Sequence, residues 1–558
     1  MDLYRTFLAI ALSFLILLGY QYLFAPPMPE QEPAPAGTPT QTTTPDPSET
    51  QTTAPTVPGT PAPSPAVAEV VVDPDARDIT VDTPLYTAVI SEQGGSIKSF
   101  LLKQYRSGVQ KDSGPMELVP ASNPATRPLL FSLDNGTGTN LPFFKAEGAQ
   151  THLNVNQGQA ELVMTATMPE GVQVVRTMRF SSDSYLIAVQ YSVENATDRP
   201  VQVSPALVWY SVPFPHVNPP SSYLFAGPMA YINDERIEVK GKELGKGPVI
   251  RQGTISWTGY ADSYFITTIM PEFTDSQTLT IQETGAGRGS SRSTLSQGLA
   301  TLQPHDSKAY SYTLYMGPKK LTILEEVGHN LAQAVNYGWL DIIAKPMLWL
   351  LNFFHGFVKN YGVAIILLTI VIKLVFWPIT QKGMKSMKNM QKLQPKIAKL
   401  REKFKDDPAK MNQEMMSLYK TYKINPLGGC LPMLIQIPFF IALYQVLIAA
   451  IELRHAPFML WINDLSAPDR LWLGFDIPYL HGMPILTLLM GASMYLQQKM
   501  TPTAADPMQA RIMQLLPIIF TFMFINFASG LVLYWFINNL LSMLQQYLIN
   551  RSSNVSKA

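Results

Sequence analysis

The sequence has few of the residues that build disulfide, metal or nucleotide sites. Cys430 is the only cysteine among 558 residues, so no disulfide can form within the chain. The seven histidines are scattered, and none stands in an HExxH or similar cluster. The phosphate-binding patterns GxxxxGKS and GxxxxGKT are also missing. We therefore expect no metal or other cofactor, and a protein that is not an enzyme.

Charge is both scarce and balanced. Charged residues make up 15% of the chain, whereas average soluble domains contain about 25%. Lys plus Arg number 42 and Asp plus Glu number 41, so the net charge of +1 gives no general attraction to a polyanion. We expect no DNA partner. The apolar residues are concentrated in a few blocks, which points instead to a membrane.

The N-terminal segment, residues 1–25, has an apolar block near the length of about 20 residues that a spanning helix needs. A cleaved signal peptide is the alternative, but Leu23-Phe24-Ala25 runs into two prolines without a small-x-small site. We expect an uncleaved transmembrane signal anchor, with Arg5 keeping the N-terminus cytoplasmic. Residues 26–76 are rich in Pro and Thr, which predicts an extended linker.

Residues 77–320 alternate apolar and polar side chains, for example over residues 172–180. Frequent glycine-containing turn signals separate these runs, so we expect a large antiparallel β-sandwich in the periplasm. A membrane-tethered sugar-acting enzyme is an alternative, because β-sandwiches often bind carbohydrate. That interpretation needs convergent histidines and acids, but three histidines of this region have no patterned acidic partners: His152, His216 and His305.

The C-terminal half is dominated by apolar blocks. Residues 321–360 include an amphipathic stretch whose clean apolar run is too short to span, so we expect an interfacial helix there. Residues 361–550 then hold five blocks that we expect to span the membrane: 361–380, 429–451, 484–500, 512–527 and 530–549. With the anchor, the fold class is a multi-pass α-helical membrane protein of six transmembrane helices, followed by a cytoplasmic tail at residues 551–558.

The charges of the loops predict the orientation. Residues 382–423 contain twelve basic and four acidic residues, whereas residues 452–476 contain two basic and four acidic ones. The positive-inside rule places the first loop in the cytoplasm and the second outside. Counting helices from a cytoplasmic N-terminus gives the same answer if the amphipathic stretch does not cross. Both termini are therefore expected in the cytoplasm.

Lys373 is a charge within an apolar block. A rise of about 1.5 Å per residue puts it roughly 18 Å from the start of that block, near the middle of a bilayer. A lysine at this depth costs about 2.5–3.5 kcal/mol on insertion scales. Snorkelling towards the interface is the alternative. Since no acid lies in any predicted span, we expect a hydrated cavity around Lys373.

Further polar residues in the predicted spans could line such a groove. Thr369 lies one helical turn before Lys373 on the same face. The others are Gln436, Tyr534, Asn538 and Asn539. Taken singly, each is better explained by an interhelical hydrogen bond, and only the set together with Lys373 indicates a hydrophilic groove.

Residues 382–425 predict an antiparallel helical hairpin with apolar seams, broken at Asp406-Asp407-Pro408 and kinked at Pro395. Methionine adapts to varied apolar partners, so four methionines are candidates for contact with a substrate: Met387, Met390, Met411 and Met415. Packing of the hairpin on itself is the alternative. The basic surface is compatible with anionic lipid, with ribosomal RNA or simply with solvent.

Seven motifs in order resemble those of the YidC–Oxa–Alb insertases over residues 336–550. They are Tyr337-Gly338-Trp339-Leu340, Lys373 with Pro378-Ile379-Thr380, Leu393-Gln394-Pro395-Lys396-Ile397, Asn425-Pro426-Leu427-Gly428-Gly429-Cys430-Leu431-Pro432, Gln436-Ile437-Pro438, Ala456-Pro457-Phe458 and Ser529-Gly530-Leu531-Val532-Leu533-Tyr534. Residues 77–320 look like the periplasmic domain of the Gram-negative YidC type. The family often has arginine where this chain has Lys373, and lysine lacks the bidentate fork of arginine.

The resemblance implies a five-helix insertase core in the bacterial inner membrane, with a groove open to cytoplasm and lipid. It implies that Ile437, Pro438 and Trp535 join Lys373 and the polar residues above as substrate-groove positions. It also implies partners: nascent membrane proteins, the Sec translocon, the ribosome and the lipid bilayer. A secondary transporter is the remaining alternative, but the inverted repeats and paired intramembrane charges of transporters are not visible.

Overall fold

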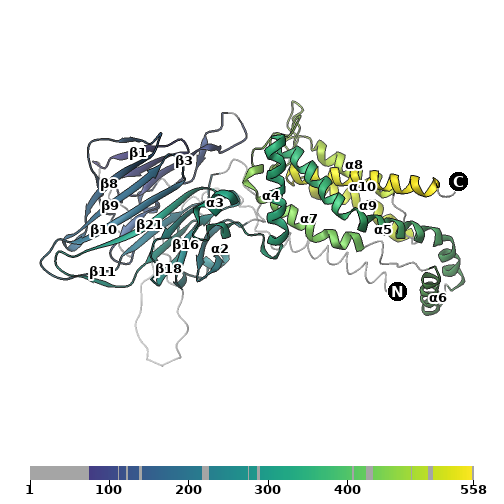
Figure 1. Cartoon of the computed structure of the whole chain (residues 1–558), viewed down its shortest axis with the longest axis horizontal. Coiled ribbons are helices and arrows are strands. Elements are labelled where there is room, and N and C mark those ends of the chain that lie inside the picture. The colour runs from purple at the N-terminus through teal and green to yellow at the C-terminus, as the bar shows by residue number, and fades with distance from the viewer. Residues whose placement is uncertain are drawn as a thin grey trace, which may run out of the picture. The chain divides into compact units, whose positions relative to one another are not determined.

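The computed structural model describes residues 75–110, 112–120, 123–136, 141–215, 225–273, 275–285, 289–404, 407–422, 431–478, 480–500 and 507–555 (Figure 1). The anchor predicted for residues 1–25 lies outside these residues, as does the predicted linker apart from Asp75 and Ala76. The described residues form two compact units, one made of residues 393–404 and 407–422 and the other of the rest.

The first part of the larger unit is mostly β-sheet, as the alternating pattern predicts. Strand β9 shows why: every second side chain along Val172–Ser181 is buried and the others are less so. The largest sheet has nine strands, in the order β14 (Glu235–Glu238), β13 (Gly227–Ile232), β16 (Ile255–Ala261), β17 (Phe265–Pro271), β21 (Ser307–Pro318), β10 (Leu186–Asn195), β9, β8 (Gln159–Thr167) and β6 (Lys145–Ala146).

Smaller sheets complete the β domain. One contains β4 (Pro115–Glu117), β3 (Ile97–Arg106), β2 (Tyr86–Ser91), β1 (Asp78–Asp82) and β7 (His152–Asn154). Another contains β15 (Val249–Gly253), β18 (Gln277–Glu283), β19 (Ser291–Ser296), β12 (Ala206–Ser211) and β5 (Leu130–Ser132). Strands β11 (Val201–Val203) and β20 (Ala300–Leu302) form a two-stranded sheet. The ladders are antiparallel except that β1 pairs with β7 in parallel, a departure from the all-antiparallel prediction.

Aromatic contacts join the sheets through a common core. Phe131 of β5 stacks on Tyr191 of β10 with ring centroids 4.1 Å apart, and Tyr86 of β2 lies 6.5 Å from Tyr185 beside β10. Such large side chains bury 150–250 Å² each. The nine-stranded sheet therefore contacts both five-stranded sheets through this core.

Helices make up the rest of the larger unit. They are α3 (Leu321–Val327), α4 (Asp341–Val358), α5 (Tyr361–Lys403), α7 (Leu431–Ala449), α8 (Ile485–Met500), α9 (Pro507–Phe524) and α10 (Ser529–Val555). Among the described residues, Tyr361–Met390 is the stretch that is long and apolar enough to cross a membrane; Ile435–Ala449 and Met513–Phe524 are shorter apolar helices. The count of six spans therefore stays a prediction.

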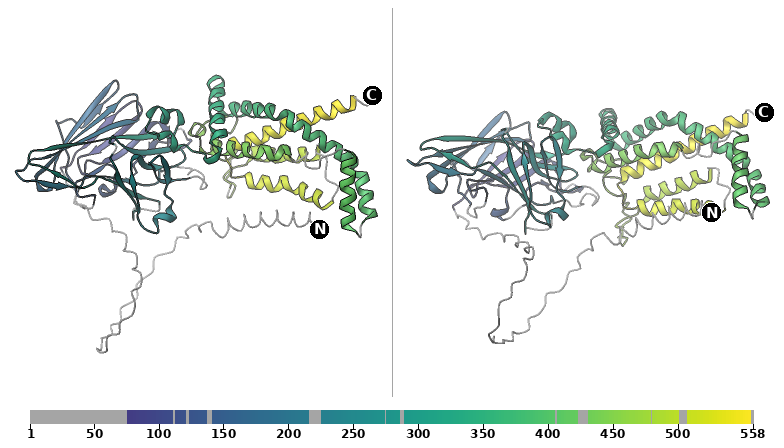
Figure 2. Two further views of the ribbon diagram at one scale, coloured as in Figure 1. Left: turned by 60° about the horizontal axis from the view of Figure 1, so that its bottom comes forward. Right: turned by 90° about the horizontal axis from the view of Figure 1, so that it is seen from below.

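Helix α4 lies crosswise to its neighbours. In each view it runs at a steep angle to α5, α7 and the helices after α7 (Figures 1 and 2). One face is buried, with Ala344, Leu348 and Leu351, and it packs on α7. The opposite face exposes Trp349 and Phe357. This two-faced helix has the form expected of an interfacial element.

Three helices extend beyond the ranges predicted to span the membrane. Residues 361–380 and the first arm of the hairpin form one continuous helix, α5, because the residues after 380 are mostly Lys, Met, Gln and Ala, which favour helix. Helix α9 begins at Pro507 rather than at residue 512, since proline suits a helix start. Helix α10 continues to Val555, so most of the predicted tail at 551–558 is helical.

The smaller unit holds the end of α5 and helix α6 (Pro408–Thr421). The two helices are separated at the predicted break, since α5 ends at Lys403 and α6 begins at Pro408. Asp407 accepts a hydrogen bond from the Lys410 backbone N–H at 3.0 Å and caps α6. Leu393 is buried, as expected of a seam residue. The Lys396 ammonium donates to the Tyr422 hydroxyl and lies 4.4 Å from the Tyr422 ring centroid, which joins the two helices.

Candidate functional site

Lys373 is buried between helices α5 and α10. Its side chain lies in the apolar stretch of α5 and is 7% exposed. The ammonium donates a hydrogen bond to Ser542 Oγ on α10, 2.7 Å away. Within the part of the chain that the structure describes, no carboxylate pairs with this ammonium. A buried cation thus has a neutral hydroxyl as its partner, which compensates only part of the cost of losing water.

Ser542 passes the interaction on to the backbone. Its hydroxyl donates to the Asn538 carbonyl oxygen at 2.7 Å, so its lone pairs are directed to Lys373. A hydroxyl that donates and accepts at once is polarised by both bonds, and such chains strengthen each member. The Ser542 oxygen is therefore a better acceptor for the Lys373 ammonium than an isolated hydroxyl would be.

Other buried polar pairs extend this chain into a strip. Gln545 Nε2 donates to Thr380 Oγ1 at 2.9 Å, which ties α10 to α5 about two helical turns beyond Lys373. Asn539 Nδ2 donates to Ser493 Oγ of α8 at 3.0 Å. All four side chains are buried. We call Lys373, Thr380, Asn539, Ser542 and Gln545 the polar strip.

The residues predicted on α7 meet the same helix near the strip. Gln436 Nε2 donates to Asn538 Oδ1 at 3.5 Å, and Gln436 also interacts with the buried Tyr534 hydroxyl. Its neighbour Pro438 is half-buried, whereas Ile437 points outward with 43% of its surface exposed. Gln436 thus contacts α10, whereas the adjacent Ile437 side chain is exposed.

Aromatic rings form an apolar wall around Trp535. Its ring lies 4.6 Å from Phe440 of α7 and 5.0 Å from Phe524 of α9, measured between centroids. Phe520 adds a third contact at 6.0 Å. This wall joins α7, α9 and α10, so polar and apolar surfaces alternate around α10.

Thr369 does not reach the strip through its hydroxyl. Thr369 Oγ1 donates to the Ile365 carbonyl of its own helix at 2.6 Å. The side chain is buried, so its polar group is satisfied locally. Helical spacing predicts Thr369 on the face of Lys373, but it cannot show that the hydroxyl bonds to a carbonyl of its own helix.

Ser542, Gln545 and Thr380 were not predicted. A signal existed: Ser542 follows Asn538 by four residues, and Tyr534 precedes Asn538 by four, so all three lie on one helical face. The sequence predicts Thr380 as the last residue of a span, because no local signal shows that α5 continues beyond it. In the structure the Lys373 ammonium is buried between helices. The open, hydrated cavity that we expect around it therefore stays a prediction.

The hairpin methionines lie on both compact units. Met387 and Met390 of α5 are half-buried. Met411 and Met415 of α6 are half-buried as well, whereas Met416 beside them is exposed. Their adaptable side chains keep part of their surface accessible, and the choice between substrate contact and self-packing stays open.

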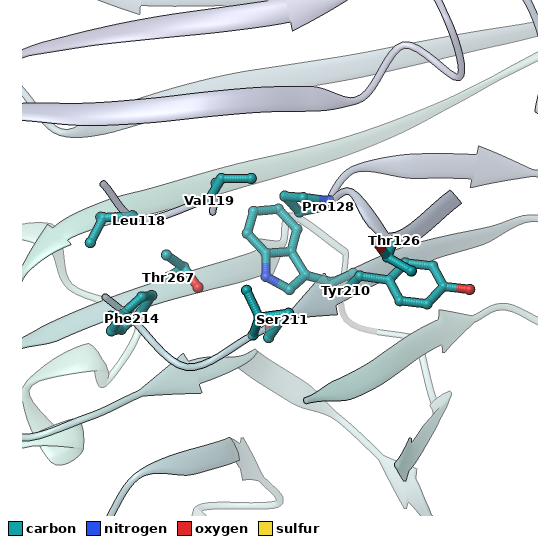
Figure 3. A pocket seen from close by; sticks show the side chains of 10 residues that line it. Leu118, Val119, Thr126, Pro128, Tyr210, Ser211, Phe214 and Thr267 are labelled. Carbon is teal, nitrogen blue, oxygen red and sulfur yellow. The ribbon is translucent and has the colours of Figure 1, made fainter. Parts of the chain in front are cut away.

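The β domain contains a cavity that is too small for a sugar. Residues including Leu118, Trp209, Tyr210 and Phe214 line a volume of about 10 Å³ (Figure 3). A space of this size holds about one water molecule. This cavity gives no support to the alternative of a sugar-acting enzyme.

Comparison with known proteins covers both parts of the chain. A family model described as 60Kd inner membrane protein matches residues 353–557, and one described as YidC periplasmic domain matches residues 78–350. The membrane protein insertase YidC of Geobacter sulfurreducens is 42% identical over 556 residues, covering 99% of each chain. That of Syntrophobacter fumaroxidans is 42% identical over 485 residues, covering 86% of this chain and 87% of its own.

A solved structure is also similar. It is described as an active YidC insertase with the first transmembrane domain resolved. It covers 87% of this chain and 94% of its own, at 21% identity and a TM-score of 0.37.

Proposed function

The chain belongs to the YidC family of membrane protein insertases, and on this premise we propose that it inserts nascent membrane proteins along the polar strip. The protein is an inner-membrane protein with a periplasmic domain, and family members are insertases rather than enzymes. The observation that carries the proposal is the Lys373 ammonium buried against Ser542 at 2.7 Å, with further polar pairs beside it.

The proposed mechanism uses the charge of Lys373. A nascent segment has an apolar stretch and a short polar flank, and the flank must cross the bilayer. The polar strip offers hydroxyl and amide partners to the flank, and the ammonium attracts acidic residues, strongly so in a low-dielectric region. We propose that α5 and α10 part enough to admit the flank. The apolar stretch then leaves into lipid, driven by the burial of its apolar area.

The proposed topology has six spans with both termini in the cytoplasm. The basic residues of 382–423 support it through the positive-inside rule. The crosswise, two-faced α4 supports an interfacial element at the outer surface. Helices α8 and α9 span 16 and 18 residues, so we propose that the bilayer is locally thin around them.

The proposed partners follow from this orientation. A cytoplasmic hairpin with a basic surface would meet the ribosome through its RNA phosphates. Its methionines, among them Met411 and Met415, would adapt to different emerging segments. We further propose that the protein acts alone or beside the Sec translocon, as the family resemblance implies.

Photocrosslinking tests the proposed path. A photoreactive amino acid at Ile437, which is 43% exposed beside the polar strip, should crosslink to a ribosome-stalled single-span membrane protein. Ile518 of α9 is the matched control, since it is the same residue type and 52% exposed but belongs to a helix that contributes no member of the polar strip. Equal crosslinking at both positions would indicate nonspecific contact through lipid and would contradict the proposal.

A further inference from the structure

The segment between α7 and α8 presents large apolar side chains to its surroundings. Leu460 is 81% exposed and Trp472 is 60% exposed. Three more residues of this segment are largely exposed: Met459, Leu473 and Phe475. They form two groups, 459–460 and 472–475, which we call the apolar tips. Large apolar residues gathered at the tips of one short segment indicate a surface that meets something apolar.

In the first tip, exposed Leu460 has a strained backbone conformation. Leu460 has a φ of 57°, in the left-handed region that leucine rarely adopts. The turn is closed by a hydrogen bond from the Phe458 N–H to the Ile462 carbonyl at 2.9 Å, and the Ile462 N–H donates back to the Met459 carbonyl at 3.1 Å. The turn therefore holds Leu460 in a strained conformation that leaves its apolar side chain exposed.

Hydrogen bonds fix the segment on the helix ends. Asp469 is buried, and its carboxylate accepts from the Trp461 indole at 2.6 Å and from the Thr487 N–H of α8 at 3.1 Å. Arg470 donates to the Ile525 carbonyl, just after α9, at 2.8 Å.

A second anchor joins the segment to α10. The Ser529 hydroxyl at the start of α10 donates to the Asp464 carbonyl at 2.8 Å. The segment is therefore a rigid frame set across the ends of three helices, and the tips cannot fold inward without breaking it.

We propose that the apolar tips insert into the headgroup–acyl boundary of the outer leaflet and anchor the α7–α8 segment in lipid. The proposal rests on the proposed topology, in which this segment is periplasmic. The frame is bonded to the starts of α8 and α10 and to the residue after α9, so it lies at one end of the helices that we propose to span the membrane. Tryptophan and leucine are residues that favour this depth.

The charged residues of the segment give no preference between zwitterionic and anionic lipid. The basic residues of the segment are already engaged: Arg470 as above, and Arg454 at 5.2 Å from the Phe265 ring centroid. Insertion by apolar area therefore outweighs attraction to headgroup charge, and the depth of the tips should depend little on the fraction of anionic lipid.

Fluorescence depth measurement tests the proposal with the full chain in nanodiscs of phosphatidylethanolamine and phosphatidylglycerol. Cys430 is first replaced (Cys430→Ser), and an environment-sensitive probe is then attached in the variants Leu460→Cys and Leu473→Cys. Asn463→Cys is the matched control, because Asn463 is exposed on the same frame between the tips. We expect blue-shifted emission and several-fold stronger quenching by spin-labelled lipid at both tips than at the control.

Emission typical of water at all three positions would overturn the proposal. Blue-shifted tips that are not quenched by spin-labelled lipid would also overturn it, because the tips would then be buried against protein and not in lipid. The measurement needs no insertion activity, so failure of the insertase proposal leaves its outcome unaffected. Tip exposure in the structure keeps the cysteine variants compatible with folding.

Discussion

Replacement of Ser542 by alanine isolates the hydrogen bond that holds the Lys373 charge. The variant leaves a buried ammonium without its 2.7 Å partner. A hydrogen bond to a charged group is worth about 1.5–3 kcal/mol, so we expect Ser542→Ala to lower the free energy of unfolding by about 2 kcal/mol. The loss should be larger than for an ordinary buried serine, because the charge stays behind.

Removal of the Lys373 charge itself should lower the free energy of unfolding little or not at all. In Lys373→Met, Ser542 keeps its bond to the Asn538 carbonyl at 2.7 Å, so no polar group is orphaned. An apolar replacement of a buried charge is often neutral or stabilising. In the double variant, Ser542→Ala should therefore cost about 0.5 kcal/mol or less, and the difference between the two costs is the coupling energy of the pair.

The assay is reversible unfolding of the full chain in mixed micelles with increasing sodium dodecyl sulfate, followed by helical circular dichroism. Insertion of a single-span substrate into proteoliposomes is measured on the same four proteins. We expect Lys373→Met to fold well and insert poorly. An equal cost of Ser542→Ala with and without Lys373 would refute the assignment of this hydrogen bond.

Two further predictions concern charge. Lys373→Glu should slow insertion of substrates with acidic flanks by about tenfold or more and spare those with basic flanks, since like charges in contact repel by several kcal/mol; unchanged rates for acidic flanks would contradict the role of the charge. At Lys319 of the β domain, burial lowers the pKa to about 8 from an ordinary 10.5, while its ammonium donates to the Asp262 carbonyl at 2.7 Å. Between these two pKa values the unfolded chain binds more protons than the folded chain, so the free energy of unfolding should rise from about pH 8 to pH 10, by at most about 3 kcal/mol. Denaturant titrations over this pH range should show a flatter rise for Lys319→Met. An unchanged rise in that variant would assign the pH dependence to other groups.

Local patterns in the sequence were sufficient for the main elements. The alternation along β9 reports burial of every second side chain, which depends only on strand geometry. The apolar run around Lys373 predicts the first part of helix α5, and the basic residues after it predict the charged second part. Helix ends were less accurate, because helix formers continue past residue 380 and across residue 551 without a local stop signal.

The sequence by itself determined that Lys373 is a cation in an apolar helix and that α10 has a polar face through Tyr534 and Asn538. Only the tertiary structure decided that the ammonium binds Ser542, 169 residues away, and that Thr369 bonds to its own helix instead. The physical reason is that periodicity fixes the direction of a side chain within its element, whereas its partner depends on how helices distant in sequence pack together.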